Sequence, residues 1–100
     1  MYRIDPARAD LAREFKERPL GAHSAELEKV LLILRWGGGR GKSLILCTKP
    51  DREWCLAKMG PRRGTPMVEY GPSYTRYADV VWACFRARWK ETTGHECPVQ

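Results

Sequence analysis

The segment 37–43, Gly-Gly-Gly-Arg-Gly-Lys-Ser, comes nearest in this sequence to a known chemical motif. Its Gly-Lys-Ser ending is typical of a loop that binds nucleotide phosphates. Such a loop also needs a glycine five residues before the glycine of that ending, and Trp36 stands there. It must follow a strand and open a helix, whereas the order predicted here is helix, loop and strand. The segment therefore favours a simple connection over a nucleotide site.

Cysteine and histidine could bind a metal, but their spacing does not favour it. No two of the four cysteines form Cys-x-x-Cys, the spacing that presents two thiolates from one turn. His95 and Cys97 could supply two ligands, which do not make a closed site. Cysteine outside such motifs is typically a small buried hydrophobe. We expect no metal site and four free cysteines in apolar surroundings, Cys47, Cys55, Cys84 and Cys97.

The residues that could perform acid–base or nucleophilic catalysis form no recognisable set. His23 precedes a helix start and His95 lies near the C-terminus, and neither is tied to a nucleophile by spacing. Asp51 and Glu53 flank a turn, where pairing with neighbouring cations is the simpler role. A chain of this size also offers little concave volume for a substrate. We therefore expect no catalytic residue in this chain.

Positive charge is concentrated between Arg40 and Arg63. This segment has seven Lys and Arg against two Asp and Glu, or 7 − 2 = +5, most of the net charge of +6. Clustered cations could neutralise nucleic-acid phosphates, with aromatic residues stacking on bases. Alternatively, Arg, Trp and Tyr are enriched at protein interfaces, and this small core cannot hide four Trp and four Tyr. We predict contact with a partner protein through Arg40, Arg62, Arg63, Tyr70, Tyr74, Tyr77 and Trp89.

The length and composition predict one small domain. The chain has 100 residues, of which 43% are hydrophobic, enough for one core. Its longest apolar run, residues 30–34, is far shorter than the roughly twenty residues that cross a bilayer. The N-terminal residues show no apolar secretion signal. We expect a soluble cytoplasmic protein with a single domain over 1–94 and a flexible tail over 95–100.

The pattern of apolar residues predicts an α+β domain in the order α-α-β-β-β-α. Asp5-Pro6 is typical of a helix start, and Ser24 is typical of a second one. Gly71-Pro72-Ser73 is expected to end the last strand. The last helix should cover an antiparallel meander. The predicted elements are helices 5–17 and 24–36, strands 44–48, 53–59 and 67–70, and helix 78–90.

An ordered set of motifs points to a known family. They are Pro19-Leu20-Gly21, His23-Ser24, Leu27, Val30, Arg52-Glu53-Trp54 and the stretch 83–88, Ala-Cys-Phe-Arg-Ala-Arg. At this spacing the chain resembles the small (alpha) subunit of N,N-dimethylformamidase and related heteromeric amidohydrolases, over about residues 19–90. The resemblance implies a larger partner subunit that carries a mononuclear iron. It also implies that the small subunit supplies no metal ligand and no cofactor contact.

We therefore expect a non-catalytic small subunit of a hydrolase that acts on C–N (amide-type) bonds of small molecules. Its expected role is to bind and stabilise the large catalytic subunit. The alternative is a basic nucleic-acid-binding or regulatory module, although nucleic acid is the weaker expectation. A homodimer with no enzymatic role is a third interpretation.

Overall fold

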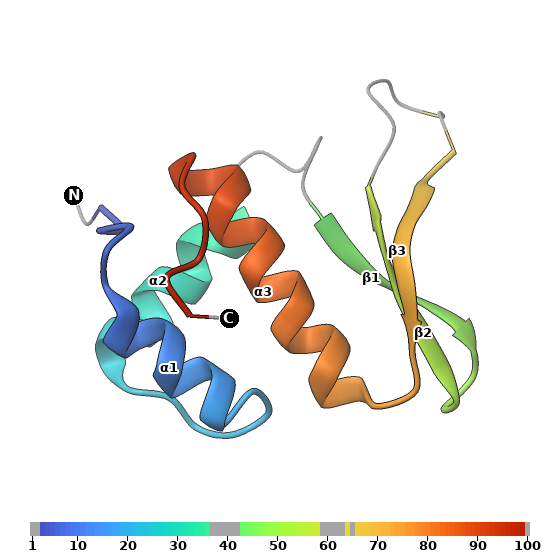
Figure 1. Ribbon diagram of the computed structural model, residues 1–100, viewed down its shortest axis with the longest axis horizontal. Helices are drawn as coiled ribbons and strands as arrows, with labels where there is room; N and C mark the ends of the chain where they lie inside the picture. The colour runs from blue at the N-terminus through green and yellow to red at the C-terminus, as the bar shows by residue number, and fades with distance from the viewer. Residues whose placement is uncertain (1–2, 37–42, 59–63, 65, 100) are drawn as a thin grey trace.

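The computed structural model describes residues 3–36, 43–58, 64 and 66–99 (Figure 1). The three strands form one antiparallel sheet in the order β1-β2-β3. The elements are α1 (Ala9–Glu17), α2 (Ala25–Trp36), β1 (Ser43–Lys49), β2 (Glu53–Lys58), β3 (Val68–Tyr74) and α3 (Tyr77–Thr93). The predicted class and element order are confirmed.

Helix α3 is the centre of the domain, because it packs on the helical pair with one side and on the sheet with the other. Figure 1 shows it between α1 and α2 on the left and the strands on the right. Phe85 and Trp89 join the cluster shared with α1 and α2, and Val80 and Cys84 join the cluster shared with the sheet. The domain therefore has two apolar clusters with one helix in common.

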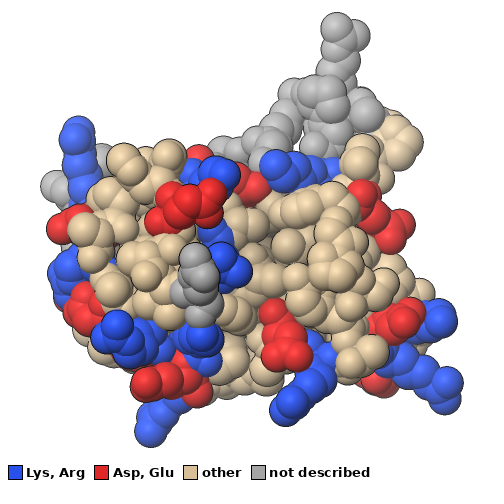
Figure 2. All heavy atoms as spheres, in the orientation of Figure 1, with Lys and Arg blue, Asp and Glu red and all other residues tan. Residues whose placement is uncertain are grey.

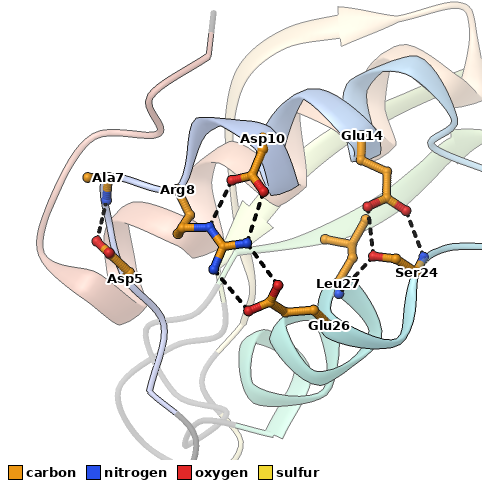
Figure 3. A network of polar contacts seen from close by, with 8 residues as sticks. All are labelled: Asp5, Ala7, Arg8, Asp10, Glu14, Ser24, Glu26 and Leu27. Atoms are coloured by element: carbon orange, nitrogen blue, oxygen red, sulfur yellow. Dashed lines mark hydrogen bonds and ion pairs between the residues drawn. The ribbon is translucent and has the colours of Figure 1, made fainter.

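Two charged contacts fix α1 against α2 (Figure 3). The Arg8 guanidinium donates two hydrogen bonds to the Asp10 carboxylate, each 2.9 Å, and two to the Glu26 carboxylate, of 2.9 and 2.8 Å. Hydrogen bonding to Arg8 lowers the pKa of Asp10 to about 2. Such two-point contacts set direction as well as distance, so they orient the two helices.

Ser24 caps α2 as its sequence predicts. Its Oγ accepts a hydrogen bond from the N–H of Leu27 at 3.3 Å. Its own N–H and hydroxyl donate to the two oxygens of Glu14, both at 2.7 Å, which lowers the pKa of Glu14. The cap of α2 is thereby attached to α1 as well.

Two element boundaries differ most from the prediction. Helix α1 begins at Ala9, because Asp5 instead forms a turn in which its carboxylate accepts the N–H of Ala7 at 2.9 Å. Strand β3 runs through Gly71 and Pro72 to Tyr74, with Gly71 at φ +74° and a register shift on the paired strand. An edge strand tolerates proline where the missing N–H would face solvent.

The C-terminal segment returns to the domain after α3. Gly94 ends the helix at φ 77°, and its N–H donates to the Lys90 carbonyl at 2.8 Å. Cys97 is then buried in the helical cluster, with Val99 packed beside it. The sequence predicts a flexible tail over 95–100, whereas the side chains of Cys97 and Val99 lie against the core. The reason is that the left-handed glycine reverses the chain direction.

Candidate functional site

A polar cluster fixes the start of β1 to α3. Ser43 is 0% exposed, and its N–H and hydroxyl donate to the Glu91 carboxylate at 2.8 and 2.6 Å. Its carbonyl accepts from Nε of Arg88 at 2.7 Å. Because the Ser43 proton is given to Glu91, the Tyr70 hydroxyl is the donor in its contact with Ser43 Oγ. Nζ of Lys58 lies 3.4 Å from Glu91 and balances its charge.

This cluster is structural, since its hydroxyl cannot meet a substrate. Ser43 has no exposed surface, and its hydrogen-bond acceptor is a carboxylate already engaged by a backbone N–H. Burial raises the pKa of the Tyr70 hydroxyl, which keeps that group neutral. In the described part of the chain, histidine is absent from the cluster. The cluster therefore positions β1 and does not supply a nucleophile.

Next to this cluster lies a groove of about 560 Å³, which is the candidate functional site. Helix α2 forms one wall, strand β1 the other, and α3 the floor. Its apolar lining includes Leu31 and Leu32 from α2, Ile45 from β1 and Val81 from α3. The charged or polar side chains of its rim are His23, Glu28, Arg35 and Arg88. An apolar groove with a polar rim is the general form of a surface that binds a partner.

The groove has an apolar wall because α2 carries more apolar residues than its contact with α1 and α3 can bury. Leu27, Val30 and Leu34 face the core and are buried. Leu32 is 57% exposed on the groove wall, and Leu20 is exposed at its end. Exposed apolar side chains gathered around one depression typically indicate a binding surface.

The structure brings one of the predicted interface tyrosines to the groove. Tyr77 is 45% exposed, lines the groove and packs its ring 5.4 Å from that of Trp54. Tyr74 is half-buried against the sheet cluster, and Tyr70 belongs to the polar cluster described above. These three tyrosines thus have three different surroundings.

The prediction that Trp89 contacts a partner is corrected by its burial. Trp89 is 0% exposed and packs with Phe85, at 5.6 Å between ring centroids, inside the helical cluster. The helical cluster that Trp89 shares with α1, α2 and Cys97 covers its indole from solvent. The other three predicted contacts, Arg40, Arg62 and Arg63, lie outside the described residues.

Sequence reasoning missed the groove residues Leu32, Ile45, Arg35 and Arg88. One signal was available, because Leu32 lies off the stripe of Leu27, Val30, Leu31 and Leu34 and so had no predicted partner within the chain. The other three could not be assigned from the sequence, since α2, α3 and β1 line one groove only in the folded domain.

The four cysteines are free. Cys55, Cys84 and Cys97 are buried, which raises the pKa of each thiol, in agreement with their interpretation as small hydrophobes. Cys47 is exposed on β1 and departs from that prediction. Within residues 3–36, 43–58, 64 and 66–99, no three His, Cys, Asp or Glu side chains gather to hold a metal ion.

Charges of both signs are interspersed on the face seen in Figure 2. Several described cations are paired with carboxylates, among them Lys49 with Glu53 at 3.4 Å and Lys90 with Glu96 at 2.7 Å. Such a mixed surface is less typical of a nucleic-acid site than an unbroken basic patch. No helix among the described residues is long and apolar enough to span a bilayer.

Comparison with known proteins confirms the resemblance inferred from the sequence. No curated protein sequence matches the chain significantly. The sequence model of one family, described as N,N-dimethylformamidase alpha subunit, matches residues 4–97. The match includes every helix and strand from α1 to α3. Because it covers nearly all of the 100 residues, the chain belongs to the N,N-dimethylformamidase alpha subunit family.

Proposed function

We propose that this chain is the non-catalytic small subunit of a heteromeric hydrolase that cleaves the C–N bond of small amides. The observation that carries the proposal is the family match over residues 4–97. A second support is that the polar cluster of the described chain is buried and engaged in holding β1 to α3. In this proposal the larger subunit contributes the catalytic groups and binds the iron, as the resemblance to the family implies.

The groove between α2 and β1 is the proposed contact surface. Leu20, Leu32 and Tyr77 surround it and remain exposed in the isolated chain. Covering them in a complex removes apolar surface from water, which favours association by about 25 cal/mol per Å² of apolar area. Binding to the folded chain alone also stabilises that fold by mass action. The four free cysteines suit a reducing, cytoplasmic compartment.

The experiment that tests this function is co-expression of the chain with the larger subunit from its own source. Native mass spectrometry of the purified material at mild salt should give a complex of the two polypeptides. Release of dimethylamine from N,N-dimethylformamide should follow the complex and be absent from the chain alone. Turnover by the isolated chain, or a monomer that retains nucleic acid, would contradict the proposal.

A salt titration separates this function from nucleic-acid binding. A largely apolar interface predicts binding that changes little with salt. Contacts to several phosphates predict a steep loss of affinity as salt rises.

A further inference from the structure

We propose that an extended segment of the larger subunit adds as a fourth strand to the free edge of β1 and lays its apolar side chains in the groove. The inference rests on the proposed function and deepens it by assigning the surface and the form of the partner. It follows from the backbone direction of β1, the shape of the groove and the charge on its rim.

Within the described part of the chain β1 pairs with β2 alone, so no described strand binds the backbone groups of its other edge. Ser43 gives its N–H to Glu91 and its carbonyl to Arg88, both on α3, so these groups point away from β2. Alternate residues of an antiparallel strand direct their backbone groups to the same side. Ile45 and Cys47 follow Ser43 in regular register, so their N–H and carbonyl groups also point outward. They are the groups that a further strand would bind.

The groove lies directly beside this edge. Ile45 belongs to both, since it lines the groove and sits in the middle of β1. A strand added to β1 would place alternate side chains over the floor of the groove at Val81 and beside its α2 wall at Leu31. This arrangement satisfies the backbone of the added strand and buries its apolar residues in one step.

The rim of the groove favours an acidic residue on the added strand. Arg35 and Arg88 both line it, against one carboxylate, Glu28. Among the described residues neither arginine forms an ion pair. Arg88 is half-buried, and a carboxylate from the partner would supply its missing counter-ion. The expected occupant is therefore an extended segment with alternating apolar residues and an Asp or Glu.

The other edge of the sheet is protected against the same addition. Strand β3 contains Pro72, which has no N–H to offer, next to Gly71 at φ +74°. Proline within an edge strand is a common device against pairing with another chain. Strand β1 has neither proline nor glycine, and its charged residue, Lys49, stands at its end. The two edges thus differ in the way expected if only β1 is to be paired.

Matched substitutions test the surface. Leu32→Asp places a charge on the groove wall, and Val68→Asp makes the same change at a residue of similar exposure, 64% against 57%, outside the groove lining. Arg35→Glu reverses a rim charge, with Arg13→Glu on α1 as its control. All four side chains are exposed, so the fold should persist, which circular dichroism will verify.

We expect Leu32→Asp to weaken binding to the larger subunit by about tenfold or more, the size typical of a central contact. Arg35→Glu should weaken it by about fivefold, less at high salt. Both controls should bind like the wild type. If the wild type binds and all four variants bind equally, the strand proposal is overturned while the proposed function stands. If the wild type does not bind, both are overturned.

Hydrogen exchange tests the strand itself. The amides of Ile45 and Cys47 should exchange quickly in the free chain and at least about tenfold more slowly in the complex, because each gains a hydrogen bond. The amides of β3 should be unchanged. Equal exchange of the β1 amides in both states contradicts strand addition. Protection in the free chain, together with a dimer by light scattering, would assign the edge to a second copy and also overturn the proposal.

Discussion

Replacing Glu91 by alanine is the sharpest test of how β1 is held to the rest of the domain. The Glu91 carboxylate accepts two hydrogen bonds from Ser43, at 2.8 and 2.6 Å, and lies 3.4 Å from Nζ of Lys58. Ser43 is 0% exposed, so its N–H loses its partner without gaining water. The replacement therefore leaves a buried donor unsatisfied, which is the costly case for a hydrogen bond.

The expected magnitude follows from these contacts. A hydrogen bond to a charged acceptor contributes about 1.5–3 kcal/mol, and two bonds to one carboxylate are not fully additive. The pair with Lys58 adds less than about 1 kcal/mol, because that lysine is half exposed. We expect Glu91→Ala to lower the free energy of unfolding by about 3 kcal/mol, which lowers the Tm of a domain of this size by about 15 °C.

Urea unfolding followed by tryptophan fluorescence measures this loss. The control is Glu96→Ala, since Glu96 pairs with Lys90 at 2.7 Å on the surface and is 72% exposed. Its removal should cost less than about 1 kcal/mol. Glu91→Gln should fall between the two, because its amide puts an NH2 donor where one of the two carboxylate oxygens accepts from Ser43. A loss for Glu91→Ala no larger than that for Glu96→Ala would refute the reasoning.

Three further results are expected. Hydrogen bonding to Arg8 holds the pKa of Asp10 at about 2, below its unfolded value near 4, so its stabilising contribution is present above about pH 4 and lost as pH falls toward 2; urea midpoints across this range should change less in Asp10→Asn. Cys47 is the exposed thiol among four, so a thiol reagent should modify one cysteine quickly in the folded chain and none quickly in Cys47→Ser. Trp89→Ala should destabilise the isolated chain by about 3–5 kcal/mol and Trp89→Phe by less, as urea unfolding will measure, because the indole fills the core; an unchanged stability with weakened partner binding would restore it to the interface.

The order of the elements could be predicted because each carries a local signal. Ser24 precedes its helix as a cap, and Leu27, Val30 and Leu34 repeat at helical spacing and are buried. The end of β3 was misjudged, because Pro72 is usually a strand terminator and is tolerated here at an edge. A local sequence signal thus predicts that a helix or strand is present more reliably than it predicts the residues at which that element begins and ends.

The site was harder to predict, because its contacts join distant residues. Ser43 and Glu91 are 48 positions apart, and nothing near either one indicates the other. Trp89 was assigned to an interface by counting aromatic residues, which ignored that α3 has apolar residues on two sides. Val80 and Cys84 on one side, and Phe85 with Trp89 on the other, carry that information in the sequence. The family could be identified without the site, because its motifs are ordered along the chain.

The position of α3 between two apolar clusters has a consequence for how the domain unfolds. Helix α3 contributes residues to both clusters. Binding of a strand to the sheet and a truncation of a core side chain in the helical pair therefore both change the packing of α3. Melting should then be a single transition, with neither half surviving the other. Binding of a partner strand at β1 should therefore also raise the stability of α1, although α3 lies between the two elements.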